Sequence, residues 1–166
     1  MKIGNDFSLH HAVLYSQTHR KVAAGRGYGI RDFLLPGEET PVKVLVSRAP
    51  PYSTFEILLK PEKPFLSSNL KRAKMIFEKV KLTKGYYSGY DVQGEVRSGS
   101  VKAVRHLNII TLLYDRDNQI VGSGTGYIAE GVLHSGDYSP FSINITAVKG
   151  TPVSFKLDYN CSFVKE

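Results

Sequence analysis

Five histidines are the residues of this chain that could most readily hold a metal ion or transfer a proton. His10 and His11 are adjacent, so on a strand their side chains point to opposite faces. His19, His106 and His134 each lack a second donor at the spacing that metal ligands need. The sequence therefore predicts no metal site, and we expect no cofactor.

Asp115–Asn118 has the side chains of the first turn of a calcium loop. Such a loop needs Gly at its sixth position and Glu at its twelfth, where this chain has Ile120 and Gly126. Aspartate and asparagine side chains also bond to nearby backbone amides in tight turns. We therefore interpret Asp115–Asn118 as a hairpin turn.

The glycine-rich run Gly122–Gly126 could cradle a phosphate if it joined a strand to a helix. Here the strand pattern continues through Tyr127 and Ile128 instead, so we assign these glycines to strand packing. The chain also contains no Gly-x-Ser-x-Gly sequence of the kind that carries a nucleophilic serine. We predict no catalytic residues and a protein that is not an enzyme.

One stretch concentrates positive charge. A single acidic residue, Glu78, interrupts six basic residues: Lys71, Arg72, Lys74, Lys79, Lys81 and Lys84. Basic groups beside aromatic ones can bind an anionic polymer, and three tyrosines follow between residues 86 and 90. However, Lys79 and Lys81 alternate with apolar residues, as the solvent face of a strand does, and lysine guards strand edges against unwanted pairing. We favour the solvated edge and keep an anion-binding patch as the alternative.

The net charge of the 166-residue chain is +7. Residues 1–69 carry nine basic and six acidic groups, and residues 70–166 carry 13 and nine. This even division favours a charge that keeps the protein soluble over one that binds an anionic partner such as nucleic acid, lipid or acidic polysaccharide. The single cysteine, Cys161, excludes an internal disulfide. We find no apolar run that could span a membrane and no secretion signal in Met1–Asp6.

The two halves of the chain repeat each other. At an offset of 99 residues, Leu14-Tyr15 falls on Leu113-Tyr114 and Gly27-Tyr28 falls on Gly126-Tyr127. The further matches at this offset pair Val22 with Val121, Gly25 with Gly124, Leu34 with Leu133, Gly37 with Gly136 and Pro41 with Pro140. One residue of slip then brings Phe55 onto Phe155 and Ile57 onto Leu157. Agreement at turn and core residues predicts two copies of one structural unit.

Short alternating segments separated by turn residues predict that each copy is all-β, a sandwich or a barrel. Two further strands, Phe77–Thr83 and Tyr90–Arg97, precede the second copy and have no counterpart before the first. We therefore expect three segments: 1–66, a partial β-sandwich repeat that lacks its opening strands; 67–76, a linker; and 77–166, a complete repeat.

Four motifs carry a family resemblance: Val92–Arg97, Leu113-Tyr114-Asp115, Gly126-Tyr127 and Gly136–Phe141. Through them the second half resembles the FxLYD domain family over residues 77–160, with a weaker partial copy over 9–60. Thr111 stands where that family has Phe. The resemblance implies tandem immunoglobulin-like β-sandwich units of a surface or secreted protein. It brings no catalytic residues.

These observations lead us to expect a non-enzymatic, extracytoplasmic spacer or protein-interaction module whose protein partner is unknown. The alternative is a binding module for an anionic polymer, a polysaccharide rather than a nucleic acid, through the Lys71–Lys84 stretch. The missing opening strands would leave the first unit with an open edge. Strands upstream in a longer chain could close it, as could a strand donated by another chain or the second unit itself. The sequence favours the first arrangement, because the first residues resume the repeat in mid-pattern.

Overall fold

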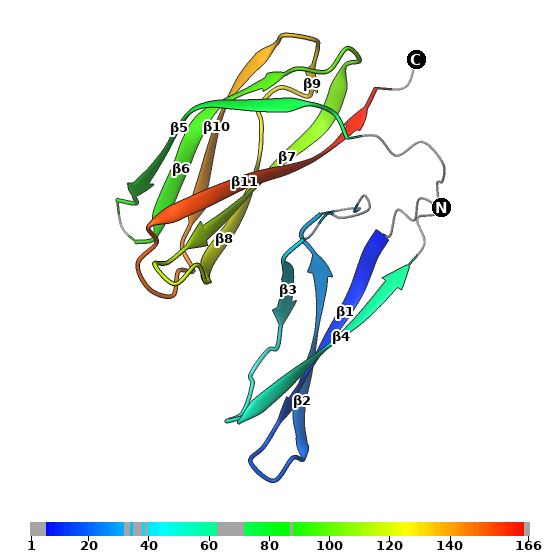
Figure 1. Cartoon of the computed structure of the whole chain (residues 1–166), viewed down its shortest axis with the longest axis vertical. Coiled ribbons are helices and arrows are strands. Elements are labelled where there is room, and N and C mark those ends of the chain that lie inside the picture. Colours follow the sequence, from blue (N-terminus) through cyan, green and yellow to red (C-terminus); the bar gives the residue numbers. More distant parts are fainter. Residues whose placement is uncertain are drawn as a thin grey trace. The chain divides into compact units, whose positions relative to one another are not determined.

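The computed structural model is all-β, as predicted, and its strands pair antiparallel in several sheets (Figure 1). It describes residues 6–31, 34, 38, 40–62, 72–86 and 88–164. None of these residues belongs to a helix long and apolar enough to cross a membrane. The chain divides into two compact units, Met1–Leu70 (unit 1) and Lys71–Glu166 (unit 2). Each unit is described by itself.

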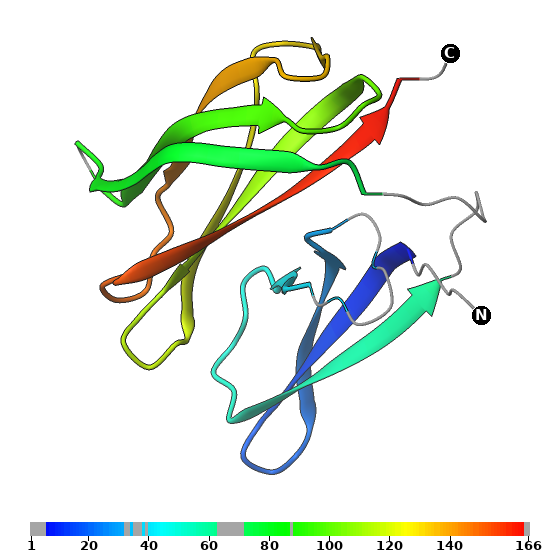
Figure 2. The same ribbon diagram turned by 45° about the horizontal axis from the view of Figure 1, so that its top comes forward.

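Unit 2 contains two antiparallel sheets, which Figure 2 shows as separate layers. The first sheet has the order β10-β6-β5, with β5 at Met75–Lys84, β6 at Tyr90–Ser98 and β10 at Tyr138–Ile145. The second has the order β11-β7-β8, with β7 at Val104–Tyr114, β8 at Ile120–Tyr127 and β11 at Ser154–Phe163; β9, Val132–Leu133, pairs with the start of β7. Strands β5 and β6 contain the residues of the two opening strands that the sequence predicted. Strand β5 begins at Met75, inside the segment expected to be a linker.

The core of unit 2 lies between these two sheets. Val92 and Val96 of β6 and Ile143 of β10 pack in one cluster with Ile109 and Leu113 of β7, and each is at most 1% exposed. Burial alternates residue by residue along β10, because successive side chains of a strand point to opposite faces. Two sheets that share one core are compatible with a β-sandwich.

Unit 1 is built differently. Its sheet has the order β3-β2-β1-β4, with β1 at Asp6–Tyr15, β2 at Lys21–Gly29, β3 at Val42–Leu45 and β4 at Thr54–Glu62 (Figure 1). The described residues between 6 and 62 form no second sheet. Strand β1 is therefore flanked on both sides, whereas β4 is an edge strand of a single layer.

Three strands have the same register in both units. Leu14 of β1 pairs with Phe55 of β4, and Leu113 of β7 pairs with Phe155 of β11. A register shift follows each of these leucines in its pairing with the next strand, β2 or β8. These pairs stand at the offsets of 99 and 100 residues that relate the two halves of the sequence.

The hairpin turns after β1 and β7 also correspond. His19 and Asn118 both have a φ of 57°, which lies in the left-handed region. Asparagine adopts this conformation more readily than most residues. In each turn this residue donates its amide hydrogen to the carbonyl oxygen three residues earlier, in Ser16 or Asp115. The Asp115 carboxylate also accepts hydrogen bonds from the amides of Asp117 and Gln119. Asp115–Asn118 is thus a hairpin turn, as expected.

The units differ at β3 and β10. Val44 of β3 pairs with Gly27 of β2, so β3 extends the sheet that contains β1. Ile143, at the same offset of 99 residues, pairs with Val92 of β6 in the opposite sheet of unit 2. Strand β3 thus belongs to the same sheet as β2, whereas β10 faces β8 across a core.

Candidate interaction surfaces

Strand β4 exposes apolar side chains on both faces, with Leu58 (47% exposed) on one face and three residues on the other. Phe55, Ile57 and Leu59 occupy alternate positions and are 63%, 40% and 58% exposed. We call these three residues the β4 strip. Their counterparts on β11, which are Phe155, Leu157 and Tyr159, are partly buried against the core of unit 2. The strip is exposed because no second sheet of unit 1 faces it within the described residues.

The rest of the face that carries the strip is less open. Strand β3 contacts both β2 and β1, whereas β4 pairs with β1 alone. Ala12 and Leu14 of β1, which pair with Ile57 and Phe55, are only 5% and 6% exposed. The uncovered apolar surface of this face is therefore concentrated on β4.

The opposite face of β4 is anchored to β1 by a polar contact. The Tyr15 hydroxyl donates a hydrogen bond to the Glu56 carboxylate at 3.0 Å, and the Tyr15 ring stacks on the His19 ring with 5.0 Å between centroids. The bond to Glu56 raises the pKa of Tyr15, because the carboxylate accepts a hydrogen bond that only the protonated hydroxyl can donate. These contacts hold β4 beside β1 without covering the strip.

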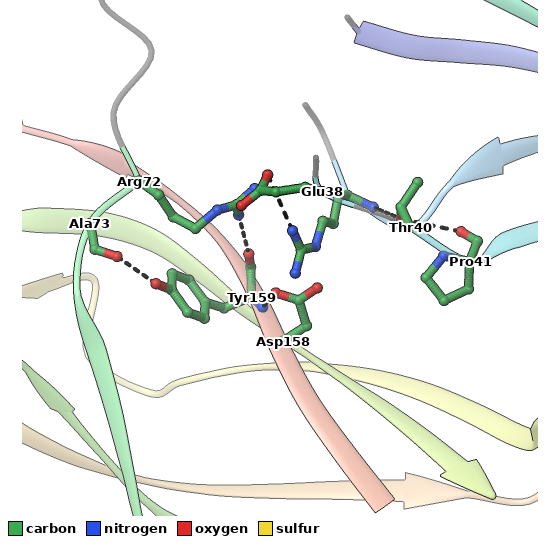
Figure 3. A network of polar contacts seen from close by, with 8 residues as sticks. Glu38, Thr40, Pro41, Arg72, Ala73, Asp158 and Tyr159 are labelled. Carbon is green, nitrogen blue, oxygen red and sulfur yellow. Dashed lines mark hydrogen bonds and ion pairs between the residues drawn. The ribbon is translucent and has the colours of Figure 1, made fainter. Parts of the chain in front are cut away.

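The basic stretch does not form one uniform patch. Lys71 lies outside the described residues. Arg72 donates from Nη1 to the carbonyl oxygen of Tyr159 at 3.3 Å, and its guanidinium lies 6.0 Å from the centre of the Tyr159 ring (Figure 3). The Tyr159 hydroxyl donates to the carbonyl oxygen of Ala73, and burial raises the pKa of this half-buried tyrosine. Arg72 therefore helps to fix the start of unit 2 against β11.

Lys79 is also engaged. It has a φ of 53° at the register shift between Glu78 and Lys81, and its Nζ lies 2.9 Å from a carboxylate oxygen of Glu95. This carboxylate raises the pKa of Lys79 through a hydrogen bond and through charge attraction. Of the remaining basic residues, Lys74 is exposed before β5, and Lys81 and Lys84 are exposed on β5, which is one of the two edge strands of its sheet. The structure thus leaves only part of the predicted set in open positions.

A shallow depression of about 470 Å³ lies over β5, β6 and β10, and the sequence did not indicate it. Its lining residues are Glu78, Lys79, Glu95, Tyr138 and Pro140. Arg97 of β6 bonds to Glu78 at 3.3 Å, and its guanidinium lies 5.6 Å from the centre of the Tyr138 ring. The charges of Glu78 and Lys79 are thus compensated by Arg97 and Glu95. Such a surface does not favour a strongly charged ligand.

The glycine-rich run can also be placed in the structure. Gly122–Gly126 lies inside β8, so these glycines are strand residues. Within the described part of the chain, no group of three or more His, Cys, Asp or Glu side chains is placed to hold a metal ion.

No protein-family model matches this chain, and no curated protein or solved structure matches it. The resemblance to the FxLYD domain family therefore rests on the sequence motifs alone.

Proposed function

We propose that this chain is a non-enzymatic, extracytoplasmic module that serves protein interaction within a larger surface or secreted protein. The observation that carries this proposal is the β4 strip. Burial of an aliphatic or aromatic side chain is worth roughly 1.5–3 kcal/mol, so three such residues left exposed at alternate positions on one face favour a partner that covers them.

We further propose that the module consists of two tandem immunoglobulin-like units. The matching register around Leu14 and Leu113 supports the repeat, because each leucine pairs with equivalent residues on both of its neighbouring strands. The resemblance to the FxLYD domain family supports the immunoglobulin-like type and the extracytoplasmic location. The compensated charges of Lys79 and Arg97 support an interaction role over a catalytic one.

Site-specific photo-cross-linking in intact source cells tests the interaction role. A photoreactive phenylalanine analogue at position 55 replaces an aromatic residue that is 63% exposed, and the same analogue at position 127 replaces Tyr127, which is 72% exposed in unit 2. We expect a discrete cross-linked product from position 55 that disappears when Leu59→Ser is added, and none from position 127. Equal products from the two positions would refute the role of the strip. Protease treatment of intact cells tests the location, since an extracytoplasmic module is cleaved from outside.

A second function, binding of an anionic polysaccharide, is favoured by Lys81 and Lys84, which stand exposed on the edge strand β5. Binding through these residues would depend strongly on salt, because neutralising an anionic polymer releases counterions.

A further inference from the structure

We propose that unit 1 is a receptor for an antiparallel β-hairpin of a partner polypeptide, which pairs with β3 and covers the β4 strip. This proposal rests on the protein-interaction role above and names the chemistry of the partner. The partner hairpin resembles β5–β6: it carries apolar side chains at alternate positions on the face that meets the sheet.

Unit 2 provides the template for this partner. Phe77 of β5 lies with its ring centroid 6.0 Å from that of Tyr159, the counterpart of Leu59 in the strip. Phe77 also packs edge-on against Phe141 of β10, with 5.9 Å between centroids. In unit 2 the hairpin of β5 and β6 thus covers the position that stays open at Leu59 in unit 1.

The position of β3 supports the same inference. A β-carbon on Gly27 would lie 2.1 Å from the carbonyl oxygen of Lys43, and one on Gly25 would lie 2.2 Å from that of Leu45. A β-carbon points away from the plane of its sheet, so the β3 backbone lies over the face of β2 as well as beside it. In unit 2 a β-carbon on Gly126 would meet the side chain of Ile143 of β10 at 2.9 Å. Strand β3 therefore lies on the side of β2 that corresponds to the place of β10.

Two pairing partners are then open to β3. In the absence of a hairpin, pairing with β2 satisfies backbone donors and acceptors that would otherwise be left unpaired. When a hairpin is present, Val44 can pair with it as Ile143 pairs with Val92. We assign the hairpin to a separate polypeptide, because the described residues between 6 and 62 supply none.

A second copy of this chain fits the surface less well. Pairing between two β4 strands would use their free edges and extend the sheet sideways. The face that carries Phe55, Ile57 and Leu59 would remain uncovered in such a dimer. Coverage of a face requires a second layer, and a hairpin provides one.

The test uses the full chain and a fluorescent synthetic peptide of residues 75–98, the β5–β6 segment, as the probe. We expect saturable binding with one peptide per chain. The double variant Phe55→Ser, Leu59→Ser should weaken peptide binding about tenfold or more, which corresponds to a loss of at least about 1.4 kcal/mol in binding free energy. The matched variant Ile120→Ser, Tyr127→Ser, at positions that are 51% and 72% exposed in unit 2, should leave it unchanged. A peptide with Ser at the positions of Phe77, Val92 and Val96 should not bind.

A structural readout accompanies the binding measurement. Peptide binding should change the amide hydrogen exchange of residues 42–45, because β3 leaves β2. No binding at peptide concentrations up to about 1 mM would overturn the proposal. Equal binding by the strip variant would also overturn it, since that is the result of strand exchange into unit 2. Dimerisation of the free chain that requires the strip would assign the surface to a second copy. Cross-linking at position 55 without peptide binding would support the protein-interaction role but refute the β-hairpin as the partner.

Discussion

Val44 of β3 pairs with Gly27 of β2 inside a single sheet. Their counterparts, Ile143 and Gly126, lie in opposite sheets of unit 2, where β10 pairs with β6. The two pairs have the same spacing in sequence and the same residue types, an aliphatic residue and a glycine. The strand at this position thus joins the sheet of β6 in unit 2 and the sheet of β2 in unit 1. Unit 1 keeps the strand but has no hairpin of this kind among its described residues.

Gly27→Ala should weaken the attachment of β3. The new β-carbon would lie 2.1 Å from the Lys43 carbonyl oxygen, and a backbone atom cannot move aside as a side-chain end can. We expect the free energy of unfolding of unit 1 to fall by about 1–3 kcal/mol, with faster amide exchange at Val44 and Leu45. Hydrogen exchange followed by NMR measures both effects. The control is Gly131→Ala, where nothing lies within 4 Å. Equal effects of the two substitutions would refute the close approach of β3.

Thr111→Val should stabilise unit 2. Thr111 is fully buried, and its hydroxyl has no hydrogen-bond partner among the described residues. Valine has nearly the same shape and removes a buried polar atom that costs roughly 1–3 kcal/mol when unpaired. We expect a gain of about 1 kcal/mol in urea unfolding. Thr125→Val, at an exposed position of β8, should change stability by less than about 0.5 kcal/mol. A loss of stability in Thr111→Val would show that the hydroxyl is bonded after all.

Tyr159→Phe should alter the dependence of stability on pH. Burial raises the pKa of Tyr159 above its ordinary value of 10.0. The resulting stabilisation is present below pH 10 and is lost as pH rises through the raised pKa. The reason is that Tyr159 loses its proton less readily in the folded state than in the unfolded state. At pH 7 the variant should lose about 1 kcal/mol with the hydrogen bond to Ala73, and this deficit should shrink above pH 10.

Urea unfolding of the Tyr159→Phe variant between pH 7 and pH 11 measures this dependence. Tyr127→Phe, at a position that is 72% exposed, is the control and should follow the unchanged protein. A deficit that stayed constant across the whole range would show that Tyr159 does not titrate differently in the folded state.

Lys81→Gln with Lys84→Gln tests the second function. Neither lysine forms an ion pair with another described residue, so their charges face solvent. If they bind an anionic polysaccharide, the variant should elute from heparin at lower salt. The slope of log affinity against log salt should decrease in magnitude by about two. The control exchanges two exposed lysines elsewhere, Lys21→Gln and Lys149→Gln, and has the same net charge. Equal retention of the two variants would show that net charge alone determines retention and would refute a binding site at Lys81 and Lys84.

The sequence allowed the turns and the shared strands to be predicted. A residue such as Asn118 tolerates a positive φ for local reasons, and the alternation of Phe141, Ile143 and Ile145 with polar residues indicates their burial. Both signals are local, so they can be read without knowledge of pairing. The same holds for the solvent-facing positions of Lys81 and Lys84.

The pairing of β3 and the depression over β5 could not be predicted in this way. Val42–Leu45 alternates as β10 does, and its pattern does not say whether β2 or a β6-like strand is available. The bonds of Glu78 to Arg97 and of Lys79 to Glu95 join residues 19 and 16 positions apart. They depend on the register shift in β5, which no local pattern marks.

Hydrogen exchange along the equivalent central strands β1 and β7 tests most directly whether unit 1 is an unfinished unit. Val13 and Leu14 of β1 correspond to Leu112 and Leu113 of β7. In a sample shown by sedimentation to be monomeric, we expect the amides of Leu112 and Leu113 to open only in global unfolding of unit 2. The amides of Val13 and Leu14 should open at a free energy at least about 2 kcal/mol lower, because one sheet protects them instead of two. Equal protection of the two strands in the monomer would contradict the open face of unit 1 and the interaction role based on it.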